Sequence, residues 1–202
     1  MYRKRFTLPA LVATVGLLLA GCGDDGSNDA GAGTATETSA TEAESNDADV
    51  EFSQGMIPHH EQAVEMAQMV PDEGVSPELI ELADAIEGAQ QPEIDQMTAM
   101  LERWGEDAPS DDPHGGHGSG DMEMGGTMSA EDMDALAASS GAEFEEMFLT
   151  MMIEHHEGAI TMAETELAEG QDSEALELAQ TIIDAQQAEI TQMEQMLQAT
   201  GS

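Results

Sequence analysis

The chain of 202 residues is long enough for one domain of ordinary size, and it carries 43 acidic residues against only 4 lysines and arginines. This charge excludes the classes of protein that bind nucleic acid or anionic lipid headgroups through a basic surface. The single cysteine excludes an internal disulfide and a metal site built from several thiolates.

Residues 1–21 have the pattern of a bacterial lipoprotein signal peptide. Three basic residues precede an apolar run that is too short to span a membrane, and the run ends in Leu-Ala-Gly before Cys22. We expect cleavage here and attachment of a lipid to Cys22, so the mature protein is predicted to be anchored outside the cytoplasmic membrane. Arg103 is then the one Lys or Arg left against all the acidic residues.

The remaining chain divides by composition. Residues 22–48 are small or acidic with almost no large apolar side chain, which predicts a disordered tether. Ser129 and Asp132 have the spacing of a capping box that opens a short helix. The domain at 49–202 is therefore predicted to contain a first repeat at 49–104, a linker rich in His, Met and Gly at 105–128, the short helix at 129–140 and a second repeat at 141–200.

The repeats are nearly superimposable in sequence. Residues 51–101 align on 147–197 with a shift of 96 positions, and 25 of the 51 pairs are identical. Each copy contains two helical stretches that divide near a glycine, Gly74 in the first and Gly170 in the second. The sequence thus predicts an all-α, four-helix bundle built from two helical hairpins, with helices at 50–70, 77–103, 143–168 and 173–199.

A histidine pair recurs in the first helix of each copy, as MIPHH from Met56 and as MIEHH from Met152. At about 100° per residue, the histidines share one broad helix face with methionines. Two-fold related hairpins would bring both faces to a common interior. The predicted metal ligands are His59, His60, His155, His156, Met56, Met152, Met66 and Met162.

The second helix of each copy places a Gln and a Glu on its core-facing side, namely Gln90, Glu93, Gln186 and Glu189. A buried carboxylate is costly unless it is paired, protonated or bound to metal. The histidines of the opposing helices are the available partners. These four side chains are predicted either to bind metal directly or to orient the histidines, and a metal-free polar network is the alternative interpretation.

Two further features leave alternatives open. Pro58 lies either inside a helix that it kinks or in the first turn of a helix beginning at Ile57. The linker carries His114, His117, Met122 and Met124, which are either a weak auxiliary metal site or incidental residues of an acidic spacer.

These motifs resemble those of a bacterial family known as domain of unknown function 305 (DUF305). The resemblance covers about residues 48–200 and rests on the doubled pattern Phe-x-x-x-Met-Ile-x-His-His-x-x-Ala-x-x-Met-Ala, which begins at Phe52 and again at Phe148. It implies a ferritin-like four-helix bundle that is usually exported. It also implies a connection with copper, because some members are associated with copper binding and copper tolerance.

The leading hypothesis is a membrane-anchored copper-binding protein without enzymatic activity, serving sequestration, tolerance or delivery. Histidine suits copper and zinc, and methionine thioethers select Cu(I) or Ag(I), so zinc or another divalent metal is the second choice. The alternative is an envelope binding or scaffold module whose His–Glu pairs are structural. A di-iron or di-manganese centre is disfavoured because the chain has no Glu-x-x-His. The sequence gives no indication of a protein partner.

Overall fold

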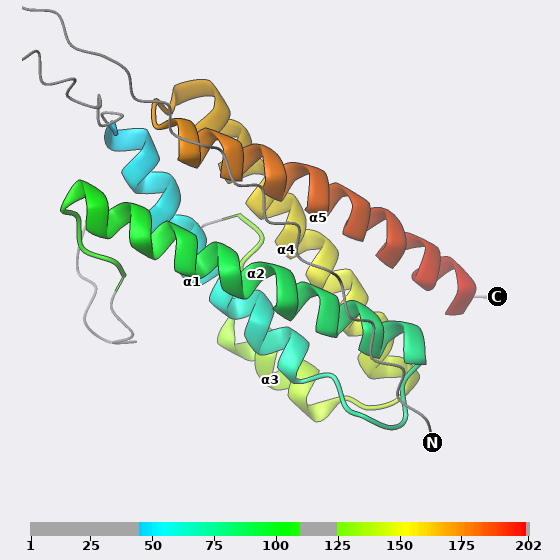
Figure 1. Cartoon of the computed structure of the whole chain (residues 1–202). Helices are drawn as coiled ribbons and strands as arrows, with labels where there is room; N and C mark the ends of the chain where they lie inside the picture. The colour runs from blue at the N-terminus through cyan, green and yellow to red at the C-terminus, as the bar shows by residue number, and fades with distance from the viewer. Residues whose placement is uncertain (1–44, 110–124, 201–202) are drawn as a thin grey trace, which may run out of the picture. The chain divides into compact units, whose positions relative to one another are not determined.

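The computed structural model describes residues 45–109 and 125–200 (Figure 1). This part of the chain folds into five helices and contains no strand, which confirms the predicted all-α class. None of the described helices is long and apolar enough to cross a membrane. The helices are α1 (Asp47–Gln68), α2 (Pro77–Trp104), α3 (Ala130–Ala138), α4 (Ala142–Glu169) and α5 (Ser173–Thr200).

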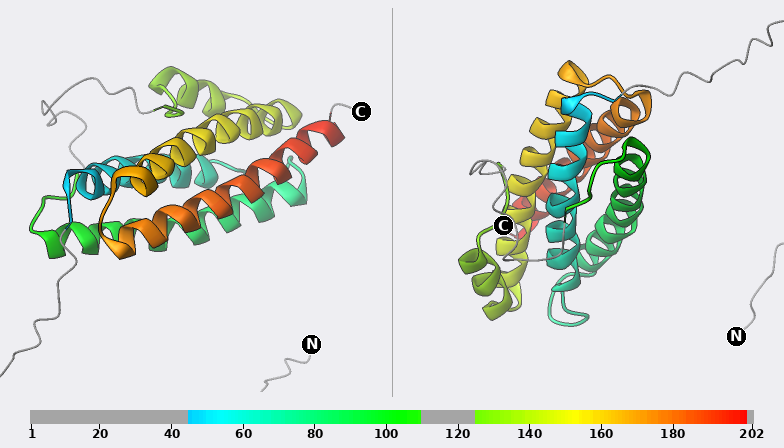
Figure 2. Two further views of the ribbon diagram at one scale, coloured as in Figure 1. Left: turned by 90° about the horizontal axis from the view of Figure 1, so that it is seen from above. Right: turned by 90° about the vertical axis from the view of Figure 1, so that its left-hand side faces the viewer.

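The four long helices form a bundle of two hairpins. Helix α1 packs along α2, and α4 packs along α5, so each sequence repeat is one hairpin (Figure 2). The main contact between the hairpins joins α1 to α4, whereas α2 and α5 meet less extensively. The short helix α3 packs mainly against α4. The bundle predicted from the repeat is thus observed, with helix bounds within three residues of those expected; its ferritin-like character stays a prediction.

Helix α1 begins earlier than its composition indicates. The Asn46 side chain accepts hydrogen bonds from the amides of Ala48 and Asp49, and the Asp49 side chain accepts one from the Asn46 amide. This capping box starts the helix at Asp47, two residues inside the segment predicted to be a disordered tether. Pro58 lies in the interior of α1, so the alternative helix start at Ile57 is wrong.

Two buried carboxylates fix how the hairpins sit against each other. The Asp49 Oδ1 atom accepts the backbone amides of Gln171 and Asp172 at 2.9 Å each. The repeat-equivalent Glu145 accepts the amide and hydroxyl of Ser76 at 3.1 and 2.6 Å. The first helix of each hairpin therefore holds the turn of the other hairpin, and this reciprocal arrangement sets the α1–α4 contact on which the histidines lie.

Several sequence predictions fall outside the described residues. They are the signal peptide at 1–21, Cys22, the tether up to residue 44 and the linker residues His114, His117, Met122 and Met124. The short helix is described, and its Ser129–Asp132 capping box is present as predicted.

Candidate metal centre

The two histidine pairs meet where α1 contacts α4. The imidazole rings of His59 and His155 lie 3.7 Å apart between centroids, with their planes inclined by 42°. These two residues are equivalent in the repeat, so the contact joins the same position of both hairpins. All four histidines are fully buried, with relative exposures of 0%. The convergence predicted from the doubled motif is therefore found.

The outer histidine of each pair is held by a carboxylate from the neighbouring helix. His60 Nε2 lies 2.8 Å from Glu93 Oε2, and His156 Nε2 lies 2.6 Å from Glu189 Oε2. A carboxylate can only accept, so Nε2 donates its proton in each bond, and the lone pair of each imidazole is left on Nδ1. This is the arrangement by which a carboxylate orients a metal-binding histidine.

Most of the ring nitrogens in this cluster have no hydrogen-bond partner. Within the described part of the molecule, these are both nitrogens of His59, both of His155, and Nδ1 of His60 and His156. Both amide atoms of Gln90 and the Oε1 atom of Gln186 are also buried without a partner. Buried polar atoms are normally paired because an unpaired one costs roughly 1–3 kcal/mol. Most of the unpaired atoms thus belong to residues that the sequence predicts as metal ligands or as their neighbours, and the others are Ser53 Oγ and the two carboxyl oxygens of Glu166.

The central histidines are neutral near pH 7. Burial lowers the pKa of His59 to about 4, with a further contribution from His60. Burial also lowers the pKa of His155 to about 2, with further contributions from His59, His156 and His60. A metal binds to the lone pair of a neutral imidazole, so these shifts keep the donor atoms available at pH 7.

The predicted methionine ligands differ in their positions. Met56 and Met152 are fully buried within one helical turn before the histidines, in apolar clusters that differ from one another. Met66 is also fully buried, whereas Met162 is only partly buried. Met66 and Met162 each lie six residues beyond the nearest histidine, which is roughly 9 Å along the helix. Met56 and Met152 are therefore better placed to share an ion with the histidines.

No three His, Cys, Asp or Glu side chains of the described residues already converge as metal ligands. The Nε2 atoms of His60 and His156 face their carboxylates, while the rings of His59 and His155 lie against each other at a tilt. Binding would therefore require the central rings to turn about their side-chain bonds, or a thioether to complete the ligand set. Two- and three-coordinate sites of this mixed nitrogen and sulfur kind suit a soft monovalent ion better than a hard one.

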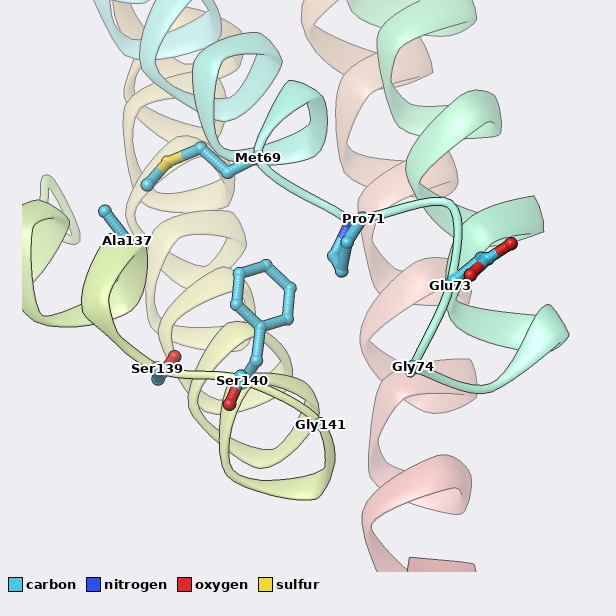
Figure 3. Close-up of a pocket in the computed structure, with 9 residues that line it drawn as sticks. Met69, Pro71, Glu73, Gly74, Ala137, Ser139, Ser140 and Gly141 are labelled. Carbon is cyan, nitrogen blue, oxygen red and sulfur yellow. The ribbon is translucent and has the colours of Figure 1, made fainter.

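A hollow of about 450 Å³ lies at the end of the bundle where α1 ends and α4 begins (Figure 3). It opens between the α1–α2 turn and the α3–α4 connection, and none of the predicted ligands lines it. Its lining residues are Met69, Pro71, Glu73, Gly74, Ala137, Ser139, Ser140, Gly141 and Phe144. The hollow and the histidine cluster are thus separate features.

The comparison with protein families matches residues 49–197 to a model described as domain of unknown function DUF305. The chain belongs to the DUF305 family. A comparison with curated proteins finds no match.

Solved structures similar to this DUF305 protein are of two kinds. A DUF305 protein from Streptomyces coelicolor, provisionally named as secreted, is 30% identical, with a TM-score of 0.68 over 77% of this chain and 94% of its own. A DUF305 fragment from Deinococcus radiodurans is also 30% identical, with a TM-score of 0.67 over 77% and 98%. CopM in its Cu(I)-bound form is 33% identical, with a TM-score of 0.61 over 75% and 96%. CopM is also known in Cu(II)-bound and silver-bound forms.

Proposed function

We propose that this DUF305 protein binds Cu(I) at the crossing of α1 and α4, with His59 and His155 as central ligands. The observation that supports this site most directly is the set of six buried ring nitrogens without hydrogen-bond partners. His60 and His156 contribute through Nδ1 while Glu93 and Glu189 hold their other nitrogen. Met56 and Met152 supply thioether sulfur from the preceding helical turn.

The donor atoms favour copper over the alternatives. Imidazole and thioether together prefer Cu(I) or Ag(I), whereas zinc would use imidazole and carboxylate without need of methionine. CopM, about one third identical to this chain, has been crystallised with Cu(I), Cu(II) and silver. The signal-like residues 1–21 and the secreted relative support a location outside the cytoplasm, with Cys22 as the lipid anchor. Sequestration, tolerance or delivery of copper suits a binding protein in that location, and no enzymatic step is required.

A structural polar network is the second candidate function for these histidines. The His60–Glu93 and His156–Glu189 hydrogen bonds favour it, because each joins the two helices of one hairpin. These bonds, however, use only two of the eight ring nitrogens. A network alone leaves the rest buried without compensation, which makes metal binding the better explanation.

A competition titration separates the two functions. The mature protein is titrated with Cu(I), Ag(I), Cu(II) and Zn(II) against a coloured chelator, and the same is done for a variant with His59→Ala and His155→Ala. We expect the parent to bind Cu(I) and Ag(I) most tightly and the variant to lose the tight class of sites. A matched variant with His114→Ala and His117→Ala should keep it. Tight Cu(I) binding by the first variant would assign the cluster to the structural network.

A further inference from the structure

A four-residue segment crosses the histidine cluster from one hairpin to the other. This segment, Gly125–Met128, is called the strap here; Figure 1 draws it beside α1 and α4, ahead of α3. At its far end, the Met128 amide donates to Gln62 Oε1 at 2.7 Å, and Gln62 Nε2 donates to the Met128 carbonyl at 2.8 Å. One side chain of α1 thus holds the backbone of the strap through two hydrogen bonds.

The near end of the strap lies directly on the backbone of α4. A Cβ atom on Gly158 would collide with the Gly125 carbonyl oxygen and come within 3.0 Å of the Gly126 Cα atom. Gly126 has a φ of 85°, and a Cβ there would collide with the Glu154 carbonyl. The helix positions that the strap touches, 154 and 158, flank His155. The close approach is possible because both partners are glycines.

Gln62 and Gly158 are equivalent positions, since they differ by the repeat shift of 96 residues. Each lies three residues after a central histidine, so the strap contacts α1 and α4 about one helical turn beyond His59 and His155. The repeats differ at this position, with a side chain that binds the strap in one copy and no side chain in the other. The strap thus lies over the central histidines.

We propose that the strap is the cover of the histidine cluster, that Gln62 and Gly158 seat it, and that metal ions enter and leave when it lifts. This inference rests on the proposed function for the ion, but the covering of the histidines stands on geometry alone. Lifting the strap requires breaking the two bonds to Gln62 and separating two glycine backbones. Among the strap residues, Met128 alone has a side chain of a kind that binds copper. We therefore expect the contacts that hold the strap in place to control how fast metal exchanges, more than how tightly it binds.

Two substitutions loosen the strap without touching a histidine. Gln62→Ala removes both hydrogen bonds, and Gly158→Ala places a methyl group where the strap backbone lies. The chain offers a matched control for each. Gln68→Ala removes a glutamine of α1 that donates an exposed hydrogen bond to Glu87 and lies away from the strap, and Gly88→Ala adds a methyl group to α2 where nothing lies within 4 Å.

The test has one arm that does not involve metal. Metal-free full-length protein is treated with diethyl pyrocarbonate, and mass spectrometry follows modification of the peptide that contains His59 and of the peptide that contains His155. Loss of the two hydrogen bonds should raise the open population, and hence the modification rate, about tenfold in Gln62→Ala. Gly158→Ala should show a rise of the same order, and both controls should match the parent.

The second arm measures transfer of Cu(I) from each loaded protein to bathocuproine disulfonate. We expect faster transfer from Gln62→Ala and Gly158→Ala with an unchanged equilibrium affinity. Parental modification rates in both variants would overturn the covering role. Raised modification with parental transfer rates would overturn the strap as the route of exchange. A parent that binds no Cu(I) would overturn the proposed function and the route together, while the modification rates would still decide whether the strap covers the histidines.

Discussion

The histidine–carboxylate pairs are the residues that connect the fold to its proposed chemistry. Each Glu lies on the second helix of a hairpin and reaches the histidine of the first, so folding of the hairpin fixes which ring nitrogen carries the proton. The remaining nitrogen keeps its lone pair in a buried environment. The orientation that a metal ligand needs is therefore established by contacts within each hairpin.

Glu93→Gln tests that role. Glutamine still accepts a hydrogen bond from His60 but lacks the charge that makes the imidazole a stronger donor to metal. We expect Cu(I) affinity to fall about 10- to 100-fold, with little change in the free energy of unfolding of the metal-free protein. Competition titration and urea unfolding measure the two quantities. Glu81→Gln, an exposed change on the same helix, is the control. An equal loss of stability with and without metal would make Glu93 a structural partner only.

Glu166 is another buried carboxyl group that the motifs do not indicate. It is 1% exposed and lies beside Asp49 at the end of the bundle. Burial, then the interaction with the Asp49 side chain and the charges of Asp49 and Asp172, raise the pKa of Glu166 to about 8. Burial alone would raise the pKa of Asp49, but hydrogen bonds from the backbone of Asn46, Asp172 and Gln171, together with the interaction with Glu166, lower it. Glu166 therefore holds the proton of this pair.

This proton gives the protein a defined pH dependence. Between the ordinary pKa of 4.5 and the folded value of about 8, the native state holds a proton that the unfolded state has lost. The contribution of Glu166 to stability is thus complete below 4.5 and is lost as pH rises through about 8, by on the order of a few kcal/mol.

Urea unfolding at about pH 6 and about pH 9 measures the effect. We expect Glu166→Gln to show a smaller fall in the free energy of unfolding than the parent, because the amide stays neutral at both values. Glu164→Gln, an exposed change on the same helix, should behave as the parent. A fall of parental size in Glu166→Gln would show that the proton is not held on this group.

At the scale of helices, two turns are held by carboxylates from the other hairpin. Asp49 binds the α4–α5 turn and Glu145 binds the α1–α2 turn, and the two contacts are related by the repeat. These contacts supply hydrogen bonds to amides that no residue of the same helix would otherwise satisfy. They also restrict how α1 and α4 slide past each other, which preserves the register of the histidines.

Glu145→Ala removes one of these contacts. The Ser76 amide and hydroxyl lose their partner in a mostly buried position, so we expect a loss of roughly 1–3 kcal/mol in the free energy of unfolding. Urea denaturation of the metal-free protein gives the value. Glu146→Ala, its exposed neighbour on α4, is the control. A loss no larger than that of the control would remove Glu145 from the account of hairpin association.

The elements that the sequence predicted well are those that depend on local spacing. The repeat and the turn glycines placed four long helices, and helical periodicity placed the histidines on a shared face. Residues that act across the bundle were missed: Asp49, Glu145 and Glu166 appear as ordinary acidic residues in a chain full of them. Asn46 was assigned to the tether because capping residues and disordered segments have the same polar composition. The contact of Gly125 with Gly158 depends on tertiary packing, so no local sequence pattern predicts it.

At the scale of the whole molecule, the charge is extreme. Asp and Glu number 43, and Arg103 is one of only four basic residues. Its guanidinium lies 2.9 Å from Glu174 and 3.5 Å from Asp172, so this cation forms ion pairs with two carboxylates at the α5 N-terminus. The rest of the described surface has acidic side chains facing one another through solvent, and their repulsion opposes the compact state.

Added salt should therefore stabilise the mature protein. The Debye length falls from roughly 30 Å at 0.01 M to roughly 10 Å at 0.1 M ionic strength, which screens the repulsion. We expect the melting temperature to rise over this range of sodium chloride, measured by circular dichroism without metal. Sucrose at equal osmolality is the control for effects unrelated to charge. A constant or falling melting temperature would show that specific contacts already neutralise the acidic surface.

The position of the metal in a crystal of the Cu(I)-loaded protein tests the central claim most directly. Data collected at the copper absorption edge give an anomalous difference map that locates the ion independently of any assumption about its ligands. We expect a peak at the α1–α4 crossing, within bonding distance of ring nitrogens from both His59 and His155. A map with copper bound elsewhere and no peak between these two histidines would contradict the assignment of the doubled motif as the metal site.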